Sequence, residues 1–140
     1  MSHTLQGERP VDILLVEDNE ADVRFLKEVL KEIPILTTLH VVSDGTLALA
    51  FLRKHGVYEQ APTPNIVLLD LFLPVVSGPE VFVEIKRDVT LAHIPLCLFV
   101  LDEHDPSLAR IKNQGLQVEC FLTKPIQEDQ LMAILRSVKA

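Results

Sequence analysis

Acidic side chains follow directly on an apolar run near the start of the chain. Glu17 and Asp18 come after ILLV, and Asp70 closes a second apolar run, NIVLLD. A single cation, Lys124, follows a third run, VECFLT. Two carboxylates about 4 Å apart repel each other by about 4 kcal/mol at an effective dielectric constant of about 20. If these acids meet, protons or a cation must relieve the repulsion, and all-oxygen ligands of this kind suit Mg²⁺.

Alternating apolar and amphipathic segments predict how these side chains are positioned. Apolar runs without polar alternation indicate strands covered on both faces, as in a parallel sheet. Segments with apolar residues at helical spacing lie between them. Strand and helix alternate five times, which predicts an α/β fold of the (βα)₅ type. The expected strands are 11–16, 37–42, 65–70, 94–101 and 118–123, and the expected helices are 20–33, 46–55, a third from residue 79, a fourth from 106 and 128–139.

Local residues predict where several of these helices begin and end. Asn19 and Asp105 are expected to cap the first and fourth helices, and Gly56 to end the second. In the first helix an inward-facing stripe is expected. Its residues are Phe25, Leu26, Val29, Leu30 and Ile33.

The predicted topology brings the chemical side chains to one edge of the sheet. In open parallel sheets, ligands bind beyond the carboxyl ends of the strands, where the connections diverge. With the first, third, fourth and fifth strands adjacent, Glu17, Asp18, Asp70 and Lys124 converge there. We interpret the three acids as a magnesium site. The alternative interpretation is that acids near residue 20 favour the N-terminus of a helix through its dipole, and we assign Glu20 and Asp22 to that role.

The composition limits the number of domains and the classes of protein to which this chain can belong. A chain of 140 residues fits one domain, and 48% hydrophobic residues suffice for a core. The net charge of −7 argues against non-specific nucleic-acid binding. Residues 1–10 are expected to form a flexible tail ahead of one domain over 11–140, and no segment has the about 20 apolar residues of a membrane span. Cys97 and Cys120 are expected to be reduced core thiols in a cytoplasmic protein.

Three motifs, VEDN, LLDLFLP…SG and LTKP, resemble in order and spacing those of the receiver domain of two-component response regulators. The resemblance covers about residues 11–139 and implies a flavodoxin-like, CheY-like sheet in the order 2-1-3-4-5, with helices on both faces. It implies that Glu17 and Asp18 bind Mg²⁺ and that a sensor histidine kinase phosphorylates Asp70. The backbone carbonyl of Phe72 would complete the metal site, and Lys124 would contact the phosphoryl group, with its bond to the following proline in the cis form.

Two further segments, HGVYEQAPTPNIVLLDL and RDVTLAHIPL, are similar to the single-domain regulators that accompany cyanobacterial phytochromes. This resemblance implies a phytochrome as the kinase, a homodimer, and signalling through contacts with a downstream protein. The protein would be a phosphoacceptor in a phosphorelay and not an enzyme.

Several positions depart from the receiver pattern. Val100 stands where the family has a Ser or Thr, whose hydroxyl moves to bond the phosphoryl group and so drives the conformational switch. Leu101 stands where a small or polar residue is usual. Phe72 replaces a residue that is often polar, and Phe121 replaces an aromatic that is often Tyr. A hydrogen bond to a charged oxygen is worth about 1.5–3 kcal/mol, so its loss weakens coupling between the site and the output surface. A degenerate receiver that presents a fixed surface, independent of phosphorylation, is therefore an alternative.

Two other functional classes compete with the receiver interpretation. A phosphatase of the haloacid-dehalogenase type uses an aspartyl nucleophile, but it needs a second acid two residues later, where this chain has Phe72. A flavodoxin-like cofactor binder would need a phosphate-binding loop after the first strand, and the anionic EDNEAD repels phosphate unless a metal is bound.

Overall fold

The structure, a computed structural model, describes residues 9–73 and 76–139. Most of the expected tail over residues 1–10, and Pro74 of the LLDLFLP motif, lie outside the described residues.

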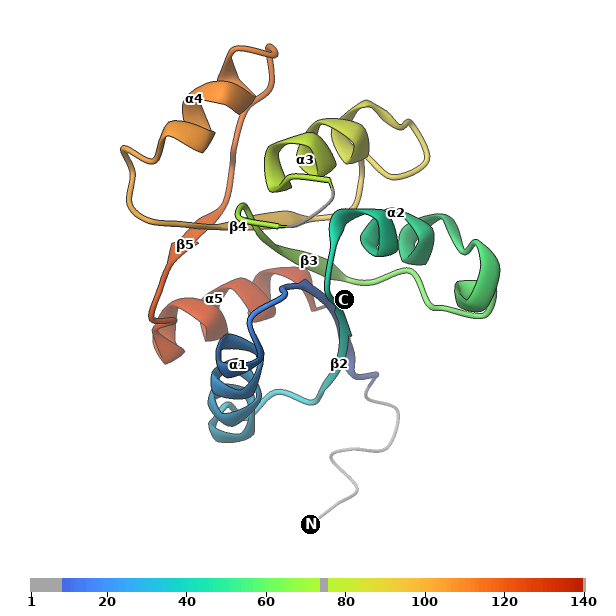
Figure 1. The fold of residues 1–140 in the computed structure, drawn as a ribbon. Coiled ribbons are helices and arrows are strands. Elements are labelled where there is room, and N and C mark those ends of the chain that lie inside the picture. Colours follow the sequence, from blue (N-terminus) through green and yellow to red (C-terminus); the bar gives the residue numbers. More distant parts are fainter. Residues whose placement is uncertain (1–8, 74–75, 140) are drawn as a thin grey trace.

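The described chain alternates strands and helices five times, as predicted (Figure 1). The strands are β1 (Val11–Val16), β2 (Thr37–Val42), β3 (Ile66–Asp70), β4 (Leu96–Val100) and β5 (Phe121–Thr123). The helices are α1 (Glu20–Glu32), α2 (Gly45–Arg53), the 3₁₀ turn η2 (Gly56–Tyr58), α3 (Gly78–Arg87), α4 (Pro106–Lys112) and α5 (Glu128–Val138).

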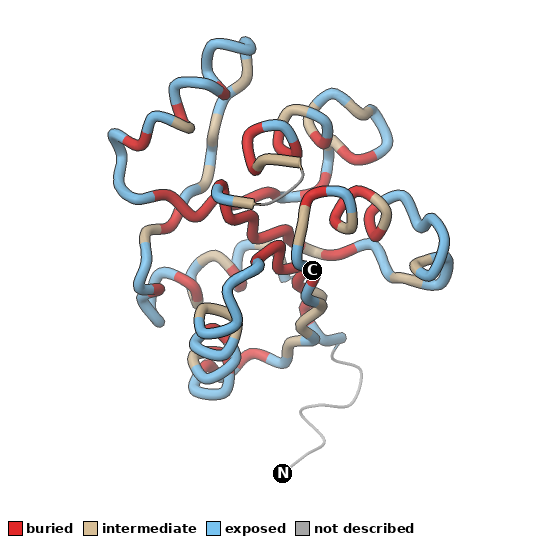
Figure 2. Tube along the Cα trace, in the orientation of Figure 1, coloured by how far each residue is buried: buried red, intermediate tan, exposed pale blue. Residues whose placement is uncertain are grey.

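The five strands form one parallel sheet in the order β2-β1-β3-β4-β5, which confirms the predicted fold. Helices α1 and α5 cover one face, and α2, α3 and α4 cover the other (Figure 1). Each face has its own apolar cluster, because alternate residues of a strand point to opposite sides. The central strands are buried throughout (Figure 2), so they fix the backbone from which the site residues project.

The sequence predicted the N-cap of α1 correctly but misplaced the end of α2. Asn19 caps α1, since its side chain accepts the backbone N–H of Asp22. Helix α2, however, ends at Arg53, and Lys54 adopts the left-handed conformation with φ 58°. The prediction that Gly56 ends this helix is wrong, because Lys54 turns the chain two residues earlier and Gly56 begins η2.

The predicted stripe on α1 is too wide. Leu26, Leu30 and Ile33 are buried against the sheet, whereas Phe25 is 45% exposed. Phe25 therefore lies at the margin of the packed face, where it lines a pocket with Pro125.

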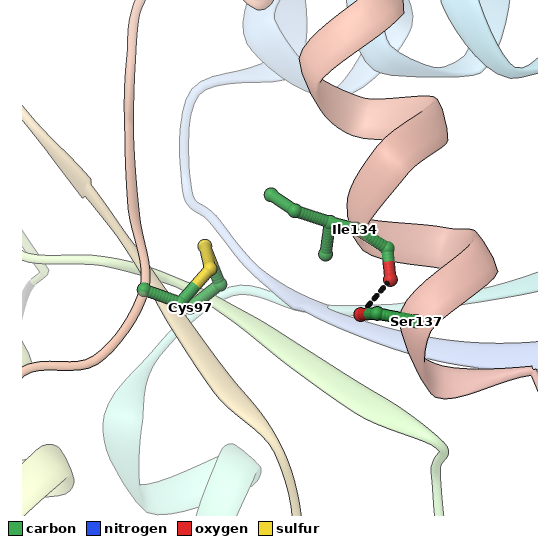
Figure 3. Close-up of a disulfide and its surroundings, with 4 residues drawn as sticks. Cys97, Ile134 and Ser137 are labelled. Atoms are coloured by element: carbon green, nitrogen blue, oxygen red, sulfur yellow. Dashed lines mark hydrogen bonds between the residues drawn. A yellow bond between two sulfur atoms is a disulfide. The ribbon is translucent and has the colours of Figure 1, made fainter.

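The expectation of two reduced thiols is wrong in this structure. Cys97 of β4 and Cys120 form a disulfide with their Cα atoms 4.7 Å apart (Figure 3). Leu98 of β4 is in register with Phe121, the first residue of β5, so the residues that precede them, Cys97 and Cys120, lie side by side. The register between β4 and β5 decides this pairing, and no local motif encodes it. Figure 3 shows the bridge on the side of α5, where Ser137 donates a hydrogen bond of 2.6 Å to the carbonyl of Ile134.

Among the described helices, none combines the length and the apolar character that crossing a membrane requires.

Candidate functional site

Residues from three strand ends converge at one edge of the sheet. Glu17 follows β1, Asp70 is the last residue of β3, and Lys124 follows β5. The Lys124 Nζ donates hydrogen bonds of 2.8 Å to Glu17 and 3.1 Å to Asp70. Glu17, Asp18 and Asp70 each offer a carboxylate oxygen within 4.8 Å of the others. The structure thus brings together the four side chains that the sequence placed at this edge.

Glu17 is the most deeply buried of the three acids, with 3% of its surface exposed. Its Oε2 accepts the backbone N–H of Asn19 at 3.3 Å, and its Oε1 accepts Lys124. The pKa of Glu17 is raised to about 7, first by burial and then by a hydrogen bond with Asp70 and the charge of Asp70, against the lowering effect of Lys124. With all three acids ionised, Glu17, Asp18 and Asp70 would carry more negative charge than the one ammonium group of Lys124 offsets.

Asp70 is held rigidly at the end of a fully buried strand. Its Oδ1 accepts the backbone N–H of Phe72 at 2.9 Å, and its Oδ2 faces Lys124. Behind it, Gly78 of α3 packs on the backbone of Leu71 and donates a 3.3 Å hydrogen bond to the Leu71 carbonyl. Ser77 caps α3 in a capping box with Glu80, which fixes where the helix begins. Close packing of α3 on the strand end thus determines where the Asp70 carboxylate points.

Lys124 enters the pocket from the loop after β5, and its peptide bond to Pro125 is cis. Burial lowers the pKa of Lys124, but hydrogen bonds to Asp22 and Glu17 and the charges of Asp70 and Glu17 outweigh that effect, so the pKa is raised. The Nζ also lies 5.6 Å from the ring centroid of Phe99. Lys124 is therefore a fixed positive charge in the pocket.

Asp22 is a site residue that the sequence analysis missed. Its Oδ2 accepts a 2.8 Å hydrogen bond from Lys124, as short as the bond to Glu17. We assigned Asp22 to the helix dipole because it lies in the first turn of α1. Its partner is 102 residues away in the chain, so no local pattern could have identified the contact.

Three of the four residues that depart from the receiver pattern, Phe72, Val100 and Leu101, line the pocket around Asp70. A pocket of about 320 Å³ is bounded by Asp70, Phe72, Val100, Leu101 and Lys124, among others. Leu101 is 68% exposed, and Phe72 is exposed as well. Val100 is buried in the apolar cluster under α2, α3 and α4 and has no hydroxyl to offer the pocket. Large apolar side chains therefore line the same pocket as Asp70.

The loop after β4 is tied to the fourth helix by a buried acid. Asp105 caps α4, as predicted, by accepting the Ser107 N–H at 2.9 Å. Its other oxygen accepts the N–H of Leu101 at 2.9 Å, which the sequence did not indicate. Phe121, on β5, is half-exposed and lies away from the pocket mouth. The roles of Val100, Leu101 and Phe121 in switching, and of the Phe72 carbonyl as a ligand, stay predictions.

The donor set fits a hard divalent cation. Three carboxylates supply oxygen ligands at one hydrated edge, since Asp18 is exposed while Glu17 and Asp70 are buried. Burial and the neighbouring Asp70 raise the pKa of Glu17 to about 7, so a cation bound beside this carboxylate would favour its ionised form. Glu17, Asp18 and Asp70 would hold the ion.

The pKa of Glu17 predicts how the stability of the metal-free protein depends on pH. Because the pKa of about 7 lies above the ordinary 4.5, this contribution to stability is fully present below about pH 4.5 and is lost as the pH rises through 7. Between pH 5 and pH 8, in EDTA, the wild type should lose about 2–3 kcal/mol more unfolding free energy than Glu17→Gln does. Urea unfolding of both proteins at both pH values measures this difference, and equal losses would contradict it.

Comparison with known proteins agrees with this geometry. The family model of the response regulator receiver domain matches residues 13–136. The response regulator Rcp1 of Synechocystis sp. is 39% identical over 131 residues, which are 94% of this chain and 88% of Rcp1. The structure of the Mn²⁺-bound form of Rcp1 superposes with a TM-score of 0.74 over 92% of this chain and 91% of that one.

Two other structures are similarly close. The phosphorylated cyanobacterial phytochrome response regulator RcpA is 36% identical, with a TM-score of 0.76 over 93% of this chain and 91% of that one. The bacteriophytochrome response regulator AtBRR is 32% identical, with a TM-score of 0.80 over 93% of each chain. This chain therefore belongs to the response regulator receiver domain family and resembles its phytochrome-associated members.

Proposed function

We propose that this protein is a single-domain response regulator, one receiver domain over residues 11–140, that accepts a phosphoryl group on Asp70 from a sensor histidine kinase. One observation carries the proposal: Asp70 is a buried carboxylate at a strand end, 3.1 Å from an ammonium group and within 4.8 Å of two further acids. Packing alone would disfavour such an arrangement, because a buried acid is costly unless it is compensated.

The chemistry follows from these contacts. A carboxylate oxygen of Asp70 attacks the phosphorus, a P–O bond to Asp70 forms, and the bond between phosphorus and the donor atom breaks. With acetyl phosphate as donor, acetate leaves as the carboxylate and no proton is transferred. Lys124 offsets charge on the phosphoryl oxygens. Mg²⁺, held by Glu17, Asp18 and Asp70, would supply further charge neutralisation in the same pocket.

We propose a phytochrome as the sensor kinase, supported by the similarity to RcpA and AtBRR. We further propose that the protein forms a homodimer and signals by contact with a downstream protein, which the half-exposed Phe121 on an edge strand favours. A cytoplasmic location fits a partner that uses ATP. Because glutathione keeps cytoplasmic thiols reduced, the Cys97–Cys120 bridge would be the oxidised form of a dithiol there.

Turnover as a phosphatase is disfavoured by Phe72, the residue two positions after the nucleophile Asp70. Phe72 donates its backbone N–H to Asp70, and its side chain has no proton for a leaving group. We therefore propose a phosphoacceptor and not an enzyme.

A degenerate receiver is the second candidate, and the surroundings of Val100 favour it. The Val100 side chain has no hydrogen-bond donor and packs into the apolar cluster, so it cannot bond a phosphoryl oxygen as a hydroxyl would. The phosphoryl group would then be accepted without the usual change at the output surface. NMR shifts of Phe121 and its neighbours, with and without beryllofluoride as a phosphoryl analogue, separate the candidates. If beryllofluoride changed the NMR shifts of Phe121 as strongly as in a conventional receiver, a surface that does not respond to phosphorylation would be excluded.

Incubation with acetyl phosphate and Mg²⁺ tests the proposed function directly. The intact mass should rise by one phosphoryl group, hydroxylamine should remove it, and EDTA should prevent the increase. Transfer from an autophosphorylated phytochrome kinase should give the same product faster. No mass increase from either donor would leave the fixed-surface candidate as the function.

A further inference from the structure

Lys124 uses all three of its N–H donors on carboxylates. The acceptors are Glu17 at 2.8 Å, Asp22 at 2.8 Å and Asp70 at 3.1 Å. An ammonium group has three donors and no acceptor, so it can contact a new oxygen only by releasing one of these partners. Any further oxygen that needs the Lys124 ammonium therefore competes with these three carboxylates for it.

The three acceptors are not equivalent. Glu17 and Asp70 belong to the group of acids that can hold a metal ion, and among the described residues Asp22 is not a member of that group. When those two carboxylates serve as ligands or as the phosphoryl acceptor, they are less able to hold the ammonium. Asp22 is then the acceptor that can keep Lys124 in place.

The local structure of α1 leaves the Asp22 carboxylate available for this contact. Asp22 occupies the third position after the cap Asn19, where an acidic side chain often reaches back to the backbone N–H of the cap residue. Here the Asn19 N–H is bonded by Glu17 at 3.3 Å instead. The Asp22 backbone N–H bonds the Asn19 side chain at 3.0 Å, which fixes the start of the helix without using the carboxylate.

We propose that Asp22 is a positioning residue that anchors the Lys124 ammonium beside Asp70 while Glu17 and Asp70 serve the metal ion and the phosphoryl group. This inference rests on the proposed function for its consequence in phosphorylation, but the contact itself can be tested separately. The Asp22 side chain is 41% exposed, so replacing it does not open a cavity in the core.

Isothermal titration with Mg²⁺ tests the anchor without any phosphoryl transfer. In Asp22→Asn the ammonium keeps only Glu17 and Asp70, so it competes more strongly with the ion, and we expect Mg²⁺ affinity to fall about tenfold. Glu20→Gln is the matched control. It removes the same charge from the same helical turn, and among the described residues Glu20 has no bond to Lys124.

A double-mutant cycle with Lys124→Met isolates the contact. In that background, Asp22→Asn should weaken Mg²⁺ binding no more than Glu20→Gln does, because no ammonium remains to be anchored. Beryllofluoride affinity, measured by ¹⁹F NMR in saturating Mg²⁺, should also fall in Asp22→Asn and be largely restored in Asp22→Glu. Circular dichroism shows whether each variant is folded.

Two results would overturn the anchor: equal Mg²⁺ affinities in Asp22→Asn and Glu20→Gln, or the same effect of Asp22→Asn with and without Lys124. Failure of the proposed function looks different. In that case the wild type takes up no phosphoryl group from acetyl phosphate, whatever the Mg²⁺ affinities of the Asp22 variants.

Discussion

Asp70→Asn is expected to take up no phosphoryl group from acetyl phosphate, a loss of several orders of magnitude in rate. The amide keeps the size of the side chain and can still accept the Phe72 N–H, so the strand end is preserved. It lacks the nucleophilic carboxylate and one acceptor for Lys124. Intact-mass measurement over time gives the rate for both proteins.

The same variant should change the titration of its neighbour. A hydrogen bond with Asp70 and the charge of Asp70 both raise the pKa of Glu17, so the pKa should fall from about 7 toward its ordinary value while burial continues to hold it up. Carbon-detected NMR of the Glu17 carboxyl group in EDTA measures this. Asp102→Asn, in the loop after β4, is the control and should leave both the rate and the pKa of Glu17 unchanged. Phosphorylation of Asp70→Asn at the wild-type rate would locate the acceptor elsewhere.

Gly78→Ala is expected to cost about 3 kcal/mol or more of unfolding free energy. A Cβ at this position would overlap the Leu71 Cα and lie 2.7 Å from the Asp70 carbonyl oxygen. These are backbone atoms of a buried strand end, so neither can move as a flexible side chain would. Helix α3 must shift away or Asp70 must be displaced, and phosphoryl uptake should slow in either case. Urea unfolding and the acetyl phosphate assay measure the two effects.

Gly115→Ala provides the comparison for that substitution. Gly115 has φ +79°, and nothing lies within 4 Å of the added Cβ, so only the backbone conformation is penalised, by about 1–2 kcal/mol. Its phosphoryl uptake should match that of the wild type. If Gly78→Ala were no more destabilising than Gly115→Ala, α3 would not pack on the Asp70 strand end as the structure has it.

The fold and the convergence of the acids could be predicted because both depend on patterns within short segments. An apolar run such as IVLL predicts a buried strand wherever it lies, and parallel strands place their carboxyl ends at one edge. Glu17, Asp70 and Lys124 directly follow or close such runs, so the topology brings them together. The cap at Asn19 is equally local, since it bonds a residue three positions away.

The contacts that the sequence missed depend on positions far apart in the chain. The bond between Asp22 and Lys124 requires the turn after Asn19 and the loop after β5 to meet, and the Cys97–Cys120 bridge requires the register of β4 against β5. Neither side chain of such a pair carries a local sign of its partner. Thus the sequence determined by itself which residues could do chemistry and at which edge of the sheet, because strand and cap patterns are local. Only the tertiary structure decided how the Lys124 charge is divided among three carboxylates, because that depends on distances between segments that the chain order does not specify.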